Sequence, residues 1–299
     1  MESWRAAPGV FWAFVLPGGL WLALFFLVPL GLVWLIAFGE RAGPADIELT
    51  WTLANYRAAL DPLYLGLFAK SFWVALAATA ICLVASFPVA LALSFAPARL
   101  KPILLLLVVL PFWTNLLIRT YAMIAVLRQN GYLNDGLEYL WLAASYLLTP
   151  LGLGRLLGER FQPLELLYNN TAVVFGIVYV HLPFMVLPLY ATLEKLDRSY
   201  LEASLNLGAS QLRTFWSVTV PLARAGVVSG VILVFIPALG TFLISDLLGG
   251  PDSQIIGNVI ERQFKAANDW PLGAALSFML MYLTFAALAL RAFLAERDV

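Results

Sequence analysis

Six long apolar segments constrain the fold of this chain more than any other feature of its 299 residues. Because about 20 apolar residues in a helix cross the hydrocarbon core of a bilayer, each segment is predicted to be a transmembrane helix. Soluble domains carry about 25% charged residues, whereas this sequence has 12% charged and 62% hydrophobic residues, which excludes a soluble fold. We therefore expect an all-α membrane protein with one domain over residues 1–299 and six spans, at 11–38, 70–95, 103–127, 171–193, 225–247 and 272–294.

Two apolar runs need separate interpretation. The run at 11–38 is longer than the core of a signal peptide, contains Pro17 and Pro29, and lacks a small-residue cleavage site, so we expect it to remain as an N-terminal span. The run at 137–148 has only about 12 residues, too few to cross a bilayer. It is predicted to be a helix at the membrane surface between the third and fourth spans, and the remaining five spans form a core within residues 70–294.

The distribution of charge predicts the orientation of the spans. With both termini and the polar loop 195–224 in the cytoplasm, the cytoplasmic side carries nine basic and six acidic residues, and the outer side eight basic and twelve acidic ones. The short loop between the second and third spans carries Arg99 and Lys101, and basic residues in short loops stay in the cytoplasm. Both observations predict that the termini and the loop 195–224 are cytoplasmic.

The loop 195–224 carries a punctuated polar motif between the fourth and fifth spans. Glu-Ala-Ser at residues 202–204 is followed by three residues and then Gly208, and Val-x-Val-Pro follows after nine more residues. The glycine stands where a helix end needs a left-handed backbone and the proline interrupts a helix, so the loop is predicted to form two short helices hinged at the glycine. Its apolar residues recur at helical spacing beside charged ones, which is typical of a surface that docks another protein. The candidate docking residues are Glu202, Ala203, Ser204, Gly208, Phe215 and Pro221.

The chain lacks the motifs of an enzyme. It contains no Gly-x4-Gly-Lys-Ser/Thr or Gly-x-Gly-x-x-Gly sequence to bind phosphates, so we expect no cofactor in this chain, and energy must come from a partner or a gradient. His181, the only histidine, precedes Pro183 by two residues and is interpreted as a packed polar residue that bonds to a freed backbone carbonyl. One cysteine, Cys82, excludes an intrachain disulfide and a thiol-rich metal site, and zero net charge gives no reason to expect nucleic acid. No catalytic residue and no metal site are predicted.

Several blocks of sequence resemble one family. The motif of the loop 195–224 is similar to the "EAA" loop of permease subunits of bacterial ATP-binding-cassette (ABC) importers, with Ser204, Val218 and Val220 replacing alanine, isoleucine and leucine. The resemblance extends over about residues 10–294. Further blocks resemble the first permease of spermidine/putrescine importers, at residues 110–122, 181–197, 236–240, 245–252 and 268–272.

This resemblance implies a type I ABC importer permease fold in the bacterial inner membrane, and a set of partners. These are a second permease, two cytoplasmic ATPases that bind ATP and magnesium, and a periplasmic or lipid-anchored substrate-binding protein. It also implies alternating access, in which the ATPases draw the docking loops together, with helix breaks at Pro183, Pro188, Pro237 and Gly240. A permease for another organic solute, such as a phosphonate or an opine, is an alternative. A self-contained secondary transporter is a weaker one, because the two halves of the sequence show no internal repeat.

A polyamine would need aromatic faces and a few carboxylates along its path. Asp246 lies close to membrane depth, where an ionisable group is costly unless it faces a cavity or a partner; alternatively it caps the turn that follows it. Arg119, in the third span, has the wrong sign for a cation path and is expected to pair with a carboxylate or with helix carbonyls. Aromatic residues also serve in interfacial belts and helix packing. The candidate path residues are Asp246, Trp113, Tyr121, Phe184 and Phe242.

Overall fold

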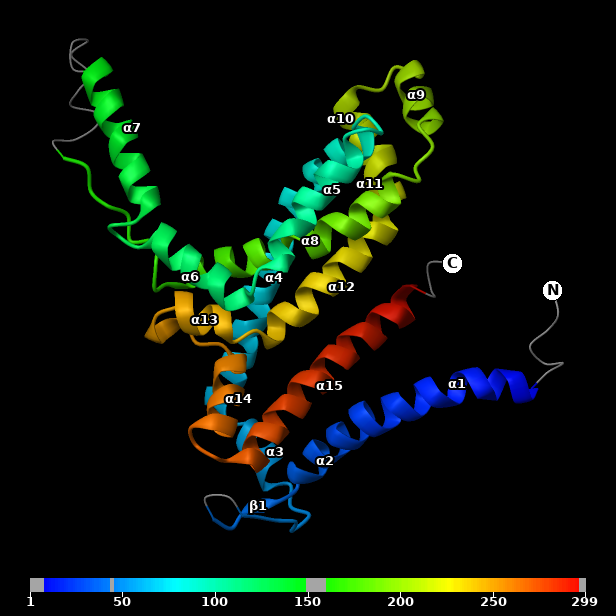
Figure 1. The fold of residues 1–299 in the computed structure, drawn as a ribbon, viewed down its shortest axis with the longest axis vertical. Helices are drawn as coiled ribbons and strands as arrows, with labels where there is room; N and C mark the ends of the chain where they lie inside the picture. Colours follow the sequence, from blue (N-terminus) through cyan, green and yellow to red (C-terminus); the bar gives the residue numbers. More distant parts are fainter. Residues whose placement is uncertain (1–7, 44–45, 149–159, 296–299) are drawn as a thin grey trace. The chain divides into compact units, whose positions relative to one another are not determined.

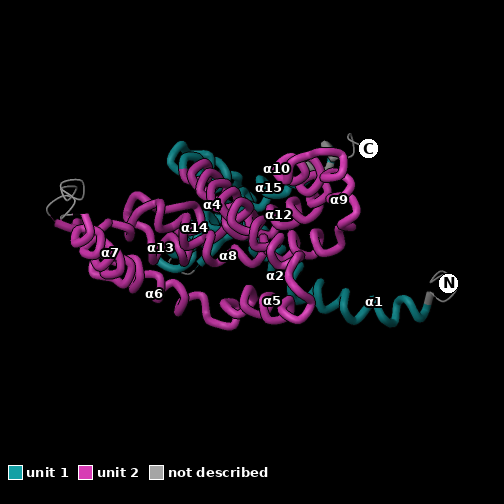
Figure 2. The backbone as a smooth tube through the Cα atoms, turned by 90° about the horizontal axis from the view of Figure 1, so that it is seen from above, with its two compact units in different colours: residues 1–66, 259–299 teal, residues 67–258 magenta. Residues whose placement is uncertain are grey.

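The computed structural model describes residues 8–43, 46–148 and 160–295, and these fold almost entirely into helices (Figure 1). A single antiparallel pair of short strands, β1 (Glu40–Arg41) and β2 (Ile47–Glu48), is the only sheet within these ranges. Two compact units are formed, one by residues 1–66 and 259–299 and the other by residues 67–258 (Figure 2). The all-α class predicted from the apolar segments is confirmed.

Four of the predicted spans are long helices, each apolar enough to cross a membrane. The first consists of α1 (Pro8–Leu22), a π-helical turn (Ala23–Leu27) and α2 (Val28–Ile36). The π-helical turn lies directly before Pro29, whose ring removes one backbone donor from the helix, and such wider turns commonly absorb that defect. The other three are α4 (Pro62–Phe95), α8 (Asn170–Leu193) and α15 (Trp270–Ala295).

The third predicted span, 103–127, is wrong as a single helix. It consists of α5 (Lys101–Val109), a 3-10 turn (Leu110–Trp113) and α6 (Leu116–Leu127), and the helices on the two sides of the break are bent by 95°. The break falls where Thr114 is extended and the side chain of Asn115 accepts a hydrogen bond from the N–H of Leu117 at 2.8 Å, which caps α6.

The fifth predicted span, 225–247, is also interrupted. Its main part is α12 (Arg224–Gly240), and after an extended residue at Thr241 a short helix, α13 (Leu243–Leu248), begins. The side chain of Asn258 donates to the carbonyl of Phe242 at 3.1 Å, which satisfies one backbone group that the break leaves open. Six spans are reached if two bent helix pairs each count as one span, namely 101–113 with 116–148 and 211–222 with 224–240.

The short apolar run predicted at 137–148 belongs to a longer helix, α7 (Tyr132–Leu148). The remaining helices are α3 (Ala54–Ala59), a 3-10 turn (Pro251–Ser253) and α14 (Ile256–Lys265). In the unit of residues 1–66 and 259–299, the ends of α2 and α15 pack together around Ala37, Ala274 and Ala275. Trp34 Nε1 donates a hydrogen bond to the hydroxyl of Tyr282 at 2.7 Å in the same unit.

The core of the unit 67–258 is the pair α8 and α12, with α4 beside them (Figure 1). Glycines permit this close approach: a Cβ at Gly226 would lie 2.6 Å from Thr192 Oγ1 and 2.7 Å from the carbonyl oxygen of Pro188. One turn along α12, a Cβ at Gly230 would lie 2.5 Å from the sulfur of Met185. Small residues that let helix backbones approach are the usual basis of helix association in membranes.

Candidate functional site

The loop between α8 and α12 folds as two short helices around Gly208, as predicted. They are α9 (Ser199–Asn206) and α10 (Gln211–Thr214). Gly208 has φ of +84°, in the left-handed region that glycine occupies without strain, and it is the only glycine with positive φ among the described residues. The side chain of Ser210 accepts a hydrogen bond from the N–H of Arg213 at 3.3 Å and caps α10.

Pro221 does not break the helix where the sequence predicted. A π-helical turn (Phe215–Thr219) precedes it and α11 (Val220–Leu222) contains it, so the missing N–H of the proline is absorbed by the wider turn. The break lies at Ala223, where the helices on either side are bent by 67°. The proline therefore marks the distorted turn before the bend rather than the bend itself.

Polar contacts join the loop to the ends of the long helices. Lys101 Nζ at the start of α5 forms an ion pair with Glu194 Oε1, directly after α8, at 2.6 Å. The guanidinium of Arg198 lies 5.1 Å from the ring centroid of Phe95 at the end of α4. Asp197 Oδ1 accepts a hydrogen bond from the N–H of Ser199 at 2.9 Å, which lowers the pKa of the Asp197 carboxyl and fixes the start of α9. These contacts lie where the start of the loop meets the ends of α4, α5 and α8.

Ser204, which replaces an alanine of the EAA loop, forms a contact that its sequence position did not predict. Its hydroxyl lies 2.9 Å from Thr214 Oγ1, and this hydrogen bond joins α9 to α10 across the glycine hinge. Thr214 is buried and Ser204 is half-buried, so the contact is partly shielded from water and links the two short helices. No sequence signal predicted this pairing, because ten residues and a non-helical turn separate the two side chains.

The six candidate docking residues do not share one surface. Glu202 and Ala203 are exposed on α9, and no described residue forms an ion pair or a side-chain hydrogen bond with Glu202. The exposed surface also carries apolar side chains, of which Leu207 is 88% exposed. Phe215, by contrast, is half-buried and packs edge-on against Phe87 of α4, with ring centroids 5.2 Å apart. Phe215 therefore anchors the loop, whereas Glu202 and Leu207 remain available to a partner.

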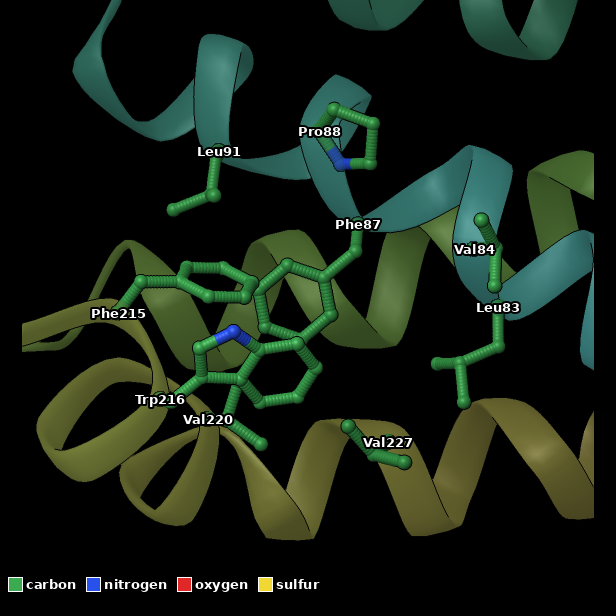
Figure 3. A pocket seen from close by; sticks show the side chains of 9 residues that line it. All are labelled: Leu83, Val84, Phe87, Pro88, Leu91, Phe215, Trp216, Val220 and Val227. Atoms are coloured by element: carbon green, nitrogen blue, oxygen red, sulfur yellow. The ribbon is translucent and has the colours of Figure 1, made fainter. Parts of the chain in front are cut away.

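Two hollows adjoin the loop. A groove of about 360 Å³ lies between α4 and the segment from Phe215 to Val227, and Figure 3 shows the rings of Phe215 and Trp216 beside that of Phe87. Its lining includes no charged side chain. A second hollow of about 600 Å³ lies between the end of α4 and the helices α9 and α10, and its lining includes Arg198 and Glu202.

Candidate path residues gather at the break of the third span. The ring of Phe184 on α8 meets that of Phe112 edge-on, with centroids 4.7 Å apart, and the guanidinium of Arg119 lies 5.8 Å from the Phe112 centroid. Trp113, in the 3-10 turn, is 75% exposed, and Tyr121 on α6 is also exposed. The expectation that Arg119 pairs with a carboxylate or a carbonyl is wrong within the described chain, because its Nε is buried and has no hydrogen-bond acceptor.

Asp246 and Phe242 lie at the other break, on or beside α13, which packs against both α6 and α8. The contact with α8 is close, since a Cβ at Gly176 would lie 2.6 Å from Ile244 Cγ2. Asp246 is exposed, and the end of α13 is closed by the N–H of Gly249, which donates to the carbonyl of Ser245 at 3.0 Å. The alternative in which Asp246 caps this turn is therefore unsupported by any hydrogen bond of the described residues.

His181 is a packed polar residue, as predicted, although its partner differs. It is 6% exposed, and its Nδ1 lies 2.9 Å from the carbonyl oxygen of Ile177, one turn earlier in α8. Pro183 frees the carbonyl of Tyr179 instead, because a proline removes the donor for the residue four positions before it. The histidine thus helps to satisfy the backbone of α8, and no carboxylate of the described chain is paired with it.

Solved structures share this arrangement of helices. The chain resembles one from the crystal structure of a bacterial ABC transporter involved in import of the acidic polysaccharide alginate, with a TM-score of 0.63, 15% identity and coverage of 99% of both chains. A second structure, of a bacterial alginate ABC transporter with an alginate pentasaccharide-bound periplasmic protein, gives a TM-score of 0.59 at 14% identity, over 100% of this chain and 98% of that one. At such identities the likeness concerns the fold. The chain therefore has the fold of these ABC transporter chains, with a helical loop between α8 and α12.

The chain belongs to the family of binding-protein-dependent transport system inner membrane components, whose profile matches residues 4–297. It is accordingly a multi-pass permease of the inner membrane, and ATP is bound and hydrolysed by a partner ATPase. Membership of this family excludes the alternative that the chain is a self-contained secondary transporter.

Curated relatives are similar over most of their length. The spermidine/putrescine transport system permease protein PotB of Escherichia coli is 42% identical over 260 residues, which is 87% of this chain and 88% of that protein. PotB of Haemophilus influenzae is 39% identical over 263 residues, 88% of this chain and 86% of that protein. The inner membrane ABC transporter permease protein YdcU of Escherichia coli is 32% identical over 246 residues, 78% of this chain and 74% of that protein.

Proposed function

We propose that this chain is the first permease of an ATP-driven importer of polyamines such as spermidine and putrescine. The observation that carries the substrate class is the 42% identity to a spermidine/putrescine permease over 87% of this chain. The exposed aromatic residues Trp113 and Tyr121 and the exposed carboxylate of Asp246 support it, since rings and carboxylates attract ammonium groups. Asp246 lies on α13, which packs against α6, the helix that carries Tyr121.

The complete importer in this proposal pairs the chain with a second permease. Two cytoplasmic ATPases that bind ATP and magnesium dock on the permeases, and a periplasmic or lipid-anchored binding protein delivers the substrate. The exposed surface of α9, with Glu202 and Leu207, is the part of this chain that meets an ATPase. Because docking of a helix pair requires an accessible apolar and charged surface, these side chains fit the role.

Transport in this proposal proceeds by alternating access. An ATPase that moves α9 and α10 also moves α8, which the short segment 194–198 joins to α9, and moves α12 through the bend at Ala223. The ion pair of Lys101 with Glu194 links the end of α8 to α5. The close contact of α8 with α12 at Gly226 makes these two helices move together. Asp246 and Phe242, beyond the end of α12, then change their access to the two sides of the membrane.

The experiment that tests the function measures the ATPase activity of the assembled complex in proteoliposomes. Binding protein loaded with spermidine or putrescine is expected to stimulate ATP hydrolysis, and binding protein loaded with a phosphonate or an opine is not. If only the phosphonate or the opine stimulated ATP hydrolysis, the proposed polyamine substrate would be wrong and the proposed importer would stand. If no ATPase co-purified with the permease, both the substrate and the importer would be wrong.

The proposed topology predicts a labelling pattern. In a Cys82→Ala background, a cysteine at Ser210 in the loop is expected to react with an impermeant maleimide only from the cytoplasmic side, and a cysteine at Asp252 only from outside. Asp252 is chosen because it is exposed, whereas its neighbour Ser253 is 2% exposed. Reaction of both cysteines from one side would contradict the predicted number of spans between them.

Removal of the Asp246 charge is expected to weaken transport of a polycation. Asp246→Asn keeps the shape of the side chain, and a charge pair at 4 Å contributes about 1 kcal/mol even in water, so uptake at sub-saturating substrate should fall by about fivefold or more. Assembly and basal ATPase activity should persist. Asp252→Asn, an exposed carboxylate outside α13, is the matched control and should retain uptake. Equal uptake by the two variants would remove Asp246 from the substrate path.

A further inference from the structure

Arg119 is a cation whose partner is missing from the described part of this chain. It lies in α6, between apolar residues of a segment with the length and hydropathy of a membrane span. Its Nε is buried and has no hydrogen-bond acceptor, and the two ion pairs of the described residues involve other side chains. The ring of Phe112 lies 5.8 Å from its guanidinium carbon.

The aromatic contact does not replace a counter-ion. The attraction between an arginine and a ring is weaker than the cost of placing an unpaired arginine inside a membrane span. The planar guanidinium also has five donors, which one ring cannot satisfy. His181, which contacts the same cluster through Phe184, donates its Nδ1–H to the carbonyl of Ile177 and is a neutral ring, so it supplies no negative charge, and no hydrogen bond joins it to the Arg119 Nε. The group that compensates Arg119 must therefore carry acceptors and a negative charge.

The segment that carries Arg119 has an uncovered apolar face. Its inner face meets α8 and α13, and Figure 2 places α5 and α6 along a margin of the unit 67–258. Ile118, next to Arg119 in the chain, is 65% exposed. Large apolar side chains on the outer face are exposed as well, namely Leu107, Leu110, Trp113, Leu117, Ile118 and Tyr121. An apolar face with one unsatisfied cation at its edge is complementary to an apolar helix that carries one acidic side chain.

We infer that the second permease covers this face and presents a carboxylate to Arg119 at membrane depth. The inference rests on the proposed pairing of two permeases. A carboxylate matches the guanidinium in charge and in its two-pronged geometry, so one aspartate or glutamate can satisfy two donors. A polyamine cannot take this place, because its ammonium groups repel the guanidinium. The pair also fixes the register of the two permeases, since an unpaired charge in the interface disfavours every other alignment.

The test is co-purification of the second permease with affinity-tagged variants of this chain. Arg119→Gln removes the charge and is expected to lower the recovered second permease by at least about tenfold, as loss of one partner of a desolvated pair does. Arg119→Lys keeps the charge and should retain most of it. Arg128→Gln, at the exposed end of the same helix, is the matched control and should match the unmodified chain. Recovery of the ATPase with each variant reports that the loop and the fold are intact.

Charge exchange identifies the partner residue. Arg119→Glu is expected to abolish recovery, and one lysine or arginine substitution among the membrane-embedded acidic residues of the second permease should restore it. Full recovery of the second permease by Arg119→Gln, or failure of every exchange, overturns the inference. If Arg119→Gln assembled normally but lost uptake, the inferred contact with the second permease would be wrong, and Arg119 would instead act on an anionic substrate. If the unmodified chain recovers no second permease, the proposed pairing itself is at fault.

Discussion

Glu202→Lys is expected to reduce polyamine uptake by at least about tenfold while the chain still folds and inserts into the membrane. Glu202 is exposed on α9 and forms no ion pair or side-chain hydrogen bond with a described residue, so a lysine there removes nothing that holds this chain together. The interaction that this substitution is expected to remove is the proposed contact of Glu202 with the ATPase. Inverting a charge in a docking surface adds repulsion to the loss of attraction, and the two effects add.

The measurements are uptake into vesicles and recovery of the ATPase with the tagged permease. Glu138→Lys makes the same change of charge at an exposed position of α7, far along the chain from the loop, and should leave ATPase recovery unchanged. If Glu202→Lys retained both uptake and ATPase recovery, the assignment of α9 as the docking surface would be wrong. If the variant failed to reach the membrane, Glu202→Gln would provide the same test without the added positive charge.

Gly226→Ala is expected to destabilise the permease by about 1–3 kcal/mol, although it adds one methyl group. The new Cβ would lie 2.6 Å from Thr192 Oγ1 and 2.7 Å from the carbonyl oxygen of Pro188, and the second contact is with backbone that cannot rotate away. Because α8 and α12 form the core of the unit 67–258, their separation loosens the link between the loop and α13. A lower thermal midpoint in detergent and reduced uptake are expected together.

The matched control for this variant is Gly66→Ala in α4. A Cβ at Gly66 meets no atom within 4 Å, and alanine is the better helix former by about 1 kcal/mol. Its thermal midpoint should equal or exceed that of the unmodified chain. A midpoint for Gly226→Ala as high as that of Gly66→Ala would contradict the close approach of α8 and α12.

The two sets of experiments distinguish docking of the ATPase from the movement of the helices. Glu202→Lys is expected to weaken the contact with the ATPase, and Gly226→Ala is expected to weaken the packing of α8 against α12. Asp246→Asn acts at the far end, where the substrate passes in the proposed mechanism. A loss of uptake with normal ATPase recovery therefore assigns a variant to the helices or the path, and a loss of both assigns it to the loop.

The sequence by itself determined the features that depend on local chemistry. The class of fold followed from the length of apolar runs, because the bilayer sets the length of a helix that crosses it. The hinge at Gly208 followed from the backbone freedom of glycine, and its φ of +84° confirms it. The packed histidine His181 followed because a buried polar side chain must find a hydrogen-bond partner, although which carbonyl it bonds to did not.

Tertiary structure alone decided the features that depend on residues distant in sequence. Hydropathy runs unbroken through Thr114, so the break in the third span became visible only where Asn115 caps α6. In the fifth span the helix ends at Gly240, one of the expected breaks, whereas Pro183, Pro188 and Pro237 lie inside continuous helices. Phe215 lies in the loop motif yet faces α4, because Phe87 offers it an apolar surface. Apolar length is a property of one segment, whereas the end of a helix, the direction of a side chain and the absence of a partner for Arg119 depend on which other segments pack there.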